Sequence, residues 1–199
     1  MNAIALMTSR NLSSAHGDRY ESTPTSLTSI LVKLGYLPIS LPSNFPTREL
    51  VLRTLEVLNP KLIVLTGGED VGANIDRDKT EGYLLDYALK HSDVRVLGIC
   101  RGMQFIAHKF GATLTRIENH VGVLHSVFDK DGYLGEVNSF HSFRVENLPS
   151  IFTVTTTSQD GSVESFKHRN LPWTACMWHP ERMEIPSWMF RILGLEDVK

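Results

Sequence analysis

The chain has few of the features that mark secreted, membrane or nucleic-acid-binding proteins. Its 199 residues include only two cysteines, which are too few for a disulfide framework. No apolar run approaches the roughly 20 residues that span a bilayer, and the run at residues 3–7 is too short for a signal peptide. The 20 Lys and Arg and the 22 Asp and Glu residues form no block of like charge. We therefore expect a cytoplasmic protein with no nucleic-acid or membrane partner.

Motifs for bound metals and cofactors are also missing. No predicted helix carries His-x-x-x-His and there is no Cys-x-x-Cys, so the sequence predicts no metal site and no cofactor. Internal repeats, low-complexity tracts and linkers are absent as well. Because the length fits one domain of ordinary size, we expect residues 1–199 to form a single domain.

What the sequence does contain is an alternation of apolar strands and amphipathic helices. Strands are predicted at residues 4–7, 37–41, 62–65 and 94–99, and helices at 26–34, 47–58, 78–91 and 103–110. This order predicts an α/β fold with a mostly parallel central sheet flanked by helices. Residues 8–22 follow the first strand and are predicted to form a ligand-contacting loop, with Arg10, Arg19 and Glu21 as candidates.

The second half of the chain has a different residue pattern. Beyond Gly111, short β-rich pieces at residues 113–117, 121–128, 133–137, 143–146, 152–157 and 163–167 show no helical periodicity. They predict a small antiparallel extension of the sheet that walls the site. A strand at 174–179 and a helix at 187–193 are predicted to close the domain.

Residues 94–104 predict a nucleophile elbow, because an apolar strand runs through Gly-Ile-Cys-Arg-Gly into a helical pattern. Glycine at 98 and 102 is explained if neighbouring chain passes close to the turn. The helix N-terminus is expected to stabilise a Cys100 thiolate. The N–H of Arg101 and an N–H from the glycine pair at 67–68 are expected to bind an oxyanion. A simple turn is the alternative interpretation of that glycine pair.

Among eight histidines, His179 is the candidate base. It ends an apolar strand, and Glu181 follows two positions later, where an extended chain returns side chains to the same side. Glu181 is then placed to orient the imidazole toward Cys100. By the same alternation Cys176 points away and is a buried structural thiol. His108, roughly two helical turns beyond Cys100, is expected to be a surface or packed residue.

Three motifs together resemble the class I glutamine amidotransferase superfamily: TGGED at 66–70, GICRGMQ at 98–104 and WHPE at 178–181. The resemblance implies a flavodoxin-like fold, a triad of Cys100, His179 and Glu181, and an oxyanion hole at Gly68 and Arg101. It also implies attack on a γ-glutamyl amide through a thioester. Residues 67–71, 77–81, 138–141 and 160–164 resemble free-standing γ-glutamyl hydrolases. Residues 118–122, 138–141, 164–168 and 177–179 resemble the γ-glutamyl-CDP-amidate hydrolases of capsule phosphoramidate biosynthesis.

Further residues are candidates for substrate contacts. Gln104 lies one helical turn past Cys100 and its side chain leans back toward the elbow. The resemblance places the α-amino and α-carboxylate groups of the substrate at residues 138–141, for which a strand-end turn is the alternative. The complete candidate set is Gly67, Gln104, Asn138, Ser139, Phe140 and His141. Scattered basic residues, which are alternatively only solvated, could meet leaving-group phosphates: Arg116, His120, His125, Lys167 and His168.

Several functions fit these residues. The first is a hydrolase that releases glutamate from a small γ-glutamyl substrate, with γ-glutamyl-CDP-amidate ahead of γ-glutamyl-γ-aminobutyrate. The second is a glutaminase subunit that delivers ammonia to a partner synthase, since the chain has no room for a synthase domain of its own. A non-enzymatic scaffold is the third, and the intact triad argues against it. The sequence leaves the oligomeric state open.

Overall fold

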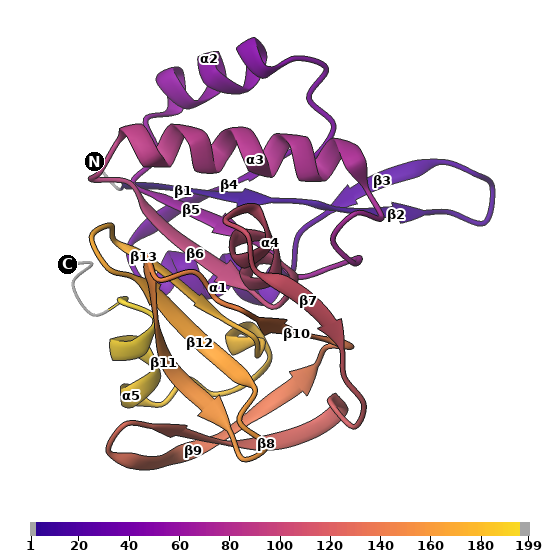
Figure 1. Ribbon diagram of the computed structural model, residues 1–199. Helices are drawn as coiled ribbons and strands as arrows, with labels where there is room; N and C mark the ends of the chain where they lie inside the picture. The colour runs from indigo at the N-terminus through magenta and orange to yellow at the C-terminus, as the bar shows by residue number, and fades with distance from the viewer. Residues whose placement is uncertain (1–2, 196–199) are drawn as a thin grey trace.

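A nine-stranded mixed sheet forms the centre of the computed structural model, which describes residues 3–195 (Figure 1). Half of the sheet is parallel and runs in the order β4 (Tyr36–Leu41), β1 (Ala3–Thr8), β5 (Leu62–Leu65), β6 (Arg95–Ile99) and β13 (Trp173–Cys176). The antiparallel half continues with β12 (Val163–His168), β11 (Phe152–Ser158), β8 (Val121–Asp129) and β9 (Gly132–Phe140). The predicted α/β class is confirmed, with an antiparallel part larger than the small extension we expected.

Helices cover both faces of the sheet and define two cores. Val51 of α2 (Arg48–Leu58), Leu84 of α3 (Ile75–Lys90) and Met103 of α4 (Arg101–Lys109) belong to one core. Leu27 of α1 (Thr25–Lys33) and Met189 of α5 (Ser187–Ile192) belong to the other. The central parallel strand β5 is apolar and buried at every position because both of its faces are covered. Within residues 3–195, no helix combines the length and hydropathy needed to cross a bilayer.

Side-chain caps mark where α2 and α3 begin. The Thr47 hydroxyl accepts a hydrogen bond from the N–H of Leu50 at 3.3 Å and so caps α2. Helix α3 begins at Ile75, three residues before the predicted start, because the Asn74 side chain accepts from the N–H of Arg77 at 3.2 Å. The polar first turn of α3 hid this start, since its residues show no apolar periodicity.

The predicted loop at residues 8–22 is instead a β-hairpin. Strands β2 (Arg10–Ser13) and β3 (Arg19–Ser22) pair antiparallel and project beyond the sheet (Figure 1). The Ser14 hydroxyl closes the turn by accepting from the N–H groups of His16 and Asp18 at 3.2 and 3.1 Å. These strands are too polar to show an alternation of apolar and polar residues, so the sequence did not predict them. A second separate pair joins β7 (Thr113–Arg116) to β10 (Phe143–Glu146).

The carboxyl ends of the parallel strands position the site. Strands β1, β5, β6 and β13 end along one edge of the sheet, at Thr8, Leu65, Ile99 and Cys176 respectively. The segments that follow these four strands carry the polar motifs singled out in the sequence. In open α/β sheets, ligands bind outside this edge.

Candidate active site

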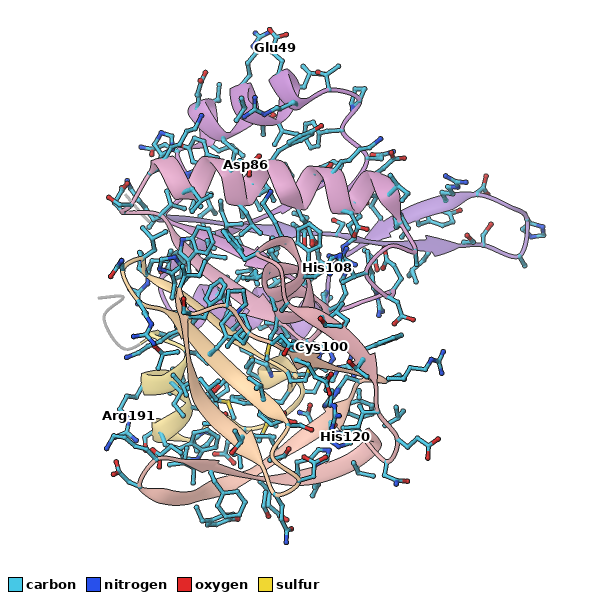
Figure 2. The ribbon with its side chains drawn as sticks, in the orientation of Figure 1. Glu49, Asp86, Cys100, His108, His120 and Arg191 are labelled. Carbon is cyan, nitrogen blue, oxygen red and sulfur yellow. The ribbon has the colours of Figure 1, made fainter. Side chains whose placement is uncertain are left out.

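A strained turn carries the candidate nucleophile. Cys100 lies between the end of β6 and the start of α4, with φ 50° and ψ −106°. A residue other than glycine rarely adopts a positive φ, so the surrounding structure must hold this conformation. The N–H of Cys100 donates to the carbonyl of Cys176 at 2.8 Å, which ties the turn to β13. The strand, turn and helix of the predicted elbow are therefore confirmed, and Figure 2 places Cys100 at the base of α4.

Gly98 and Gly102 let neighbouring chain pack against the elbow, as the sequence predicted. A Cβ on Gly98 would lie 2.7 Å from Cδ1 of Ile106 and 2.9 Å from the backbone nitrogen of Met103. A Cβ on Gly102 would overlap the carbonyl of Leu65 at the end of β5. Both contacts involve groups that cannot move without displacing the sheet or the helix, so glycine is required at both positions.

Burial controls the acidity of Cys100. The residue is 6% exposed, and burial raises the pKa of its thiol to about 12, although the N–H of Arg101 lowers it. The N–H of Arg101 favours the thiolate, which is the direction expected of a helix N-terminus, but desolvation of a charged sulfur outweighs this one backbone dipole. Cys100 is therefore a neutral thiol that needs a base to remove its proton.

His179 and Glu181 form a buried hydrogen bond. Nδ1 of His179 lies 2.7 Å from Oε1 of Glu181. The backbone differs from the expected extended chain, because Pro180–Arg182 forms a short 3-10 helix, η1. A tight turn, and not strand alternation, brings the two side chains together. Since Nδ1 is engaged by the carboxylate, Nε2 of His179 is the nitrogen left to exchange a proton.

Two predicted substrate residues instead contact the base. The Asn138 side chain donates to the carbonyl of His179 at 2.8 Å and accepts from its N–H at 2.9 Å. Gly67 leaves room for the imidazole, since a Cβ there would lie 2.6 Å from Cε1 of His179. Strand β9 and the loop after β5 therefore fix the position of His179 from two sides.

Cys100 and His179 line the same cavity of about 240 Å³. The other residues of its wall come from the hairpin, the loop after β5, the end of β9 and η1: Arg10, Asn11, Leu12, Gly68, Glu69, Phe140 and Arg182. The Arg182 guanidinium lies 5.0 Å from the centre of the half-exposed Phe140 ring. Sequence reasoning missed Arg182, although its place beside Glu181 was a signal. Of the hairpin candidates, Glu21 binds the N–H and hydroxyl of Ser43 instead.

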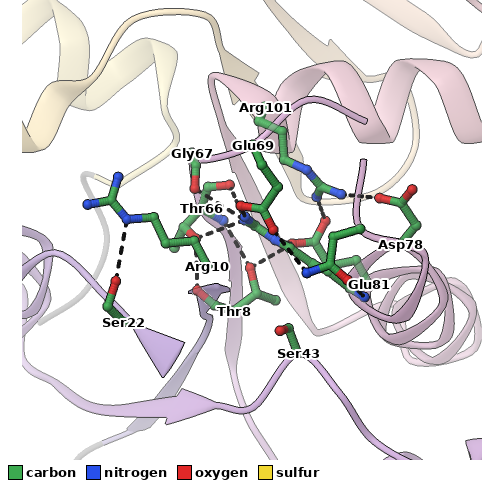
Figure 3. Close-up of polar contacts among 12 residues, drawn as sticks. Thr8, Arg10, Ser22, Ser43, Thr66, Gly67, Glu69, Asp78, Glu81 and Arg101 are labelled. Atoms are coloured by element: carbon green, nitrogen blue, oxygen red, sulfur yellow. Dashed lines mark hydrogen bonds and ion pairs between the residues drawn. The ribbon is translucent and has the colours of Figure 1, made fainter. Parts of the chain in front are cut away.

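A buried ion network braces the loop that follows β5 (Figure 3). Arg77 of α3 is fully buried and donates from Nε to Oε1 of Glu81 at 2.9 Å. Its Nη2 donates to the carbonyls of Thr66 at 2.7 Å and Gly67 at 3.2 Å. The Arg77 guanidinium thus binds the backbone at the start of the glycine pair, and Glu81 balances its charge.

The same network reaches the elbow. The Arg101 side chain pairs with Glu81 and with Asp78, so α3 holds the first residue of α4 (Figure 3). Burial would raise the pKa of Glu69, but Arg77 and further hydrogen bonds hold it below its ordinary value, so Glu69 faces the cavity as an anion. The positioning role of residues 77–81 was missed, because it depends on how two helices pack.

Of the two predicted oxyanion donors, Gly68 lines this cavity and Arg101 directly follows Cys100 in the chain. Arg101 is the first residue of α4, where backbone N–H groups lack intrahelical partners. Gly68 has φ 151°, and a Cβ there would overlap the Arg77 guanidinium. The glycine pair is therefore a sterically constrained loop and not only a turn. That these N–H groups bind an oxyanion stays a prediction.

Gln104 lies beside the cavity of Cys100 and not in its wall. It lines a neighbouring cavity with Asp70, His108 and Phe143, among others. Its side-chain amide donates to the carbonyl of Phe143 at 3.2 Å. This bond engages the group predicted to contact a γ-glutamyl backbone. His108 is exposed on α4, as expected.

The segment at residues 138–141 combines structural and surface roles. The Ser139 hydroxyl is buried and donates to the carbonyl of His120 at 2.6 Å. Phe140 faces the cavity, whereas His141 is buried against His120. Only Phe140 of this segment therefore lines the Cys100 cavity. The alternation of the strand, which turns 139 and 141 away from 140, explains the split.

The basic residues proposed for leaving-group phosphates do not gather in one place. Lys167 and His168 are wrong for this role, because β12 runs antiparallel to β13 and carries them to the opposite end of the sheet, beside Thr174 and Trp173. The direction of β12 could not be read from its sequence. Arg116 lies over the Phe143 ring. His120 and His125 stack at a centroid distance of 4.1 Å.

Cys176 has the structural role that the sequence predicted. It is fully buried, and its thiol donates to the carbonyl of Trp178 at 3.5 Å. Burial raises the pKa of this thiol well above its ordinary value. Cys176 is therefore inert toward electrophiles in the folded chain.

The elbow, the buried base and the parallel sheet agree with the family assignment. The family described as glutamine amidotransferase class-I matches residues 16–188, and the chain belongs to it. Crystal structures support the same fold: a protein described as a GMP synthase subunit, from Thermoplasma acidophilum, has a TM-score of 0.73 at 23% identity, covering 98% of this chain and 94% of that one. A glutamine amidotransferase from Thermotoga maritima has a TM-score of 0.63 at 18% identity, covering 91% and 77%.

The named relatives include a free-standing hydrolase and glutamine-hydrolysing parts of synthases. The chain is 34% identical over 128 residues to gamma-glutamyl-CDP-amidate hydrolase of Campylobacter jejuni subsp. jejuni, covering 61% of this chain and 62% of the relative. It is 31% identical over 163 residues to a glutamine-hydrolysing GMP synthase subunit of Methanobrevibacter smithii, covering 77% and 80%. It spans 26% of the length of GMP synthase from Wolinella succinogenes, at 31% identity over 142 residues, which are 65% of this chain. Family membership supports a hydrolase of glutamine-type amides.

Proposed function

We propose that this chain is a cysteine-dependent hydrolase that cleaves a γ-glutamyl amide and releases glutamate, with γ-glutamyl-CDP-amidate as its substrate. The observation that carries the proposal is the shared cavity of Cys100 and His179, with Glu181 bonded to the far nitrogen of the imidazole. This is the arrangement of nucleophile, base and orienting group that acyl transfer requires. The proposed reaction needs no cofactor.

In the first half of the reaction, the thiol proton of Cys100 passes to Nε2 of His179 and the sulfur attacks the γ-carbonyl carbon. Because burial keeps the thiol neutral, proton transfer accompanies attack and does not precede it. The N–H groups of Arg101 and Gly68 receive the negative charge on the carbonyl oxygen. The C–N bond then breaks, and His179 returns its proton to the leaving nitrogen.

In the second half, His179 takes a proton from water, and the resulting hydroxide attacks the γ-glutamyl thioester. The C–S bond breaks, a C–O bond has formed, and the proton returns to Cys100. Glu181 accepts a hydrogen bond from Nδ1 throughout and stabilises the imidazolium in both halves. Glutamate leaves with the oxygen of one water.

Two cations support an anionic leaving group. Arg10 and Arg182 line the cavity, and arginine is suited to bind phosphates through paired N–H donors. Similarity to gamma-glutamyl-CDP-amidate hydrolase supports the same substrate. The leaving group of γ-glutamyl-γ-aminobutyrate carries a single carboxylate, so it would form fewer ion pairs with the same two arginines.

A second candidate function is a glutaminase subunit that serves a partner synthase. Its support is the similarity to the GMP synthase subunit of Methanobrevibacter smithii, of which this chain spans 80%. In that case free glutamine is the substrate, and turnover without the synthase is slow.

A panel of γ-glutamyl compounds tests the proposal. We would assay glutamate release from γ-glutamyl-CDP-amidate, γ-glutamyl-γ-aminobutyrate and glutamine at equal concentrations, with Cys100→Ala as the blank. The expected result is a kcat/KM for the CDP-amidate at least tenfold above that of the other two. Brisk ammonia release from glutamine alone would contradict both the specialised hydrolase and the synthase-dependent subunit. Failure to trap a γ-glutamyl adduct on Cys100 by mass spectrometry would contradict the mechanism.

A further inference from the structure

Three histidines that are distant in sequence converge at the antiparallel end of the site. His125 lies on β8, and His120 and His141 flank the ends of β8 and β9, where Val121 pairs with Phe140. One imidazole nitrogen from each of these three residues lies within 4.8 Å of the other two. Figure 2 shows His120 at this end of the sheet, below Cys100.

In two of the histidines, a hydrogen-bond partner shows which ring nitrogen carries the hydrogen. Nε2 of His120 lies 3.0 Å from a carboxylate oxygen of Asp160, and Nδ1 of His141 lies 2.9 Å from the carbonyl oxygen of Phe143. Both partners only accept hydrogen bonds, so each of these nitrogens carries the hydrogen. In neutral rings, Nδ1 of His120 and Nε2 of His141 are then lone pairs, and they face each other at 3.2 Å.

Two further buried groups beside this pair have no partner. Among residues 3–195, Nε2 of His125 and both carboxylate oxygens of Glu164 form no hydrogen bond, although all three atoms are buried. Oε1 of Glu164 lies 3.6 Å from Nε2 of His141. Buried polar atoms without partners are rare, and here the carboxylate beside His141 and one nitrogen of His125 accompany two lone pairs that face each other. A bound cation would satisfy these buried lone pairs and the negative charge of the carboxylate.

We propose that His120 Nδ1, His125 Nε2, His141 Nε2 and the carboxylate of Glu164 bind one divalent metal ion of the Zn²⁺ type. The 3.2 Å between the facing nitrogens matches the separation of about 3.3 Å that tetrahedral Zn–N bonds of 2.0–2.1 Å require. Asp160 and the Phe143 carbonyl orient two of the ligands, which is the usual outer shell of a histidine metal site. His125 is half-buried, and its ring would have to approach the other two to complete the site.

The site escaped the sequence search because its ligands come from separate strands. Spacing motifs detect ligands that share one helix or loop, whereas these ligands are brought together by the pairing of β8 with β9 and by the position of β12. The proposal replaces the phosphate-contact role suggested for His120 and His125. It is independent of the proposed reaction, because metal content is measured without substrate.

Metal uptake tests the proposal in a Cys100→Ser parent, which removes the thiol that would otherwise bind zinc with His179. The parent is stripped with a chelator, incubated with Zn²⁺ and desalted, and its zinc is measured by mass spectrometry. The expected result is one zinc per chain, a raised Tm with Zn²⁺, and a visible Co²⁺ spectrum of tetrahedral intensity. Zinc below one tenth of an equivalent at micromolar free Zn²⁺ would overturn the proposal and leave a shared proton as the occupant of the histidine pair.

Variants then locate the bound metal. His125→Gln and Glu164→Gln should each lower zinc uptake at least tenfold and abolish the Tm shift. His108→Ala, which removes an exposed histidine on α4, is the matched control and should keep the full equivalent. His125→Gln keeps the proposal testable even where Glu164→Gln fails to fold, because His125 is only half-buried. Full uptake by His125→Gln would contradict the assignment.

Discussion

The carboxylate of Glu81 pairs with the side chains of Arg77 and Arg101, and all three side chains are buried. Arg77 belongs to α3 like Glu81, whereas Arg101 is the first residue after the nucleophile. One carboxylate therefore links two cations, one of which holds the glycine loop and the other the elbow. The geometry of the candidate site depends on this carboxylate, although it does not face the cavity.

Glu81→Gln should lower the free energy of unfolding by about 3 kcal/mol, because Glu81 is the fully buried one of the two carboxylates that pair with each guanidinium, and Glu69 and Asp78 are partly exposed. Urea denaturation followed by circular dichroism measures this change. Asp86→Asn is the matched control, since Asp86 also lies on α3 and pairs with Lys109 of α4, but at the surface. The control should change stability by less than about 0.5 kcal/mol. Equal effects of the two variants would contradict a structural role for the network.

Alkylation of Cys100 should be slow at neutral pH and should accelerate about tenfold for each pH unit from 7 to 9, because only the thiolate reacts. The reason is the pKa of about 12 that burial gives this thiol. The measurement is the rate of iodoacetamide labelling in a Cys176→Ser background. A rate that does not change with pH would instead indicate a thiolate already paired with the His179 imidazolium.

The same thiol should make stability depend on alkaline pH. Its folded-state pKa is raised above the unfolded value of about 8.5, so the folded state holds the proton more tightly. The contribution is complete below about pH 8.5 and is lost progressively as the pH rises toward 12. The difference in unfolding free energy between the native chain and Cys100→Ser should therefore fall by about 1.4 kcal/mol per pH unit between pH 9 and 11. If the unfolding free energies of the two proteins changed with pH in the same way, the raised pKa of Cys100 would be ruled out.

Gly67→Ala should lower kcat by about 100-fold while the chain still folds, because the added Cβ displaces the imidazole of His179. The assay is glutamate release from the best γ-glutamyl substrate. Gly82→Ala, within α3, is the control, since its Cβ would only reach 3.7 Å from Nζ of Lys109. That variant should keep its activity and gain about 0.5–1 kcal/mol of stability from its higher helix propensity. An unchanged kcat in Gly67→Ala would show that the His179 imidazole accommodates the added Cβ without losing its position.

Glu181→Gln should lower kcat by about 10²- to 10³-fold, and less than Cys100→Ala, which should abolish turnover. The carboxylate stabilises and orients the imidazole through Nδ1 but forms no bond to substrate. KM should change little, because Glu181 does not line the cavity. Steady-state kinetics separate these effects, and an unchanged kcat would require another orienting group.

Local patterns in the sequence predicted the parts of the site that lie within a few residues of one another. Gly98, Cys100 and Gly102 define the elbow through steric limits that act over four positions. His179 and Glu181 were paired correctly even though the backbone between them is a 3-10 turn and not a strand. Short separations tolerate such an error, because several conformations bring the same two side chains into contact.

Contacts that depend on packing between elements could not be predicted. Glu81 meets Arg101 only because α3 lies beside α4, and the histidine cluster exists only because β8 pairs with β9. Lys167 was placed at the wrong end of the sheet because a strand's sequence does not reveal its direction. The β2–β3 hairpin was missed for a different reason, since its strands are polar and bury no face.

The order of the strands has a consequence for biosynthesis. Strand β13 follows the other strands of the sheet in the chain, yet it pairs with β6 in the middle of the sheet and leads directly into His179 and Glu181. Until residues 173–181 leave the ribosome, the growing chain has Cys100 and an open sheet edge but no base. Under the proposed mechanism, the nascent protein therefore has no base for its thiol until β13 has paired with β6.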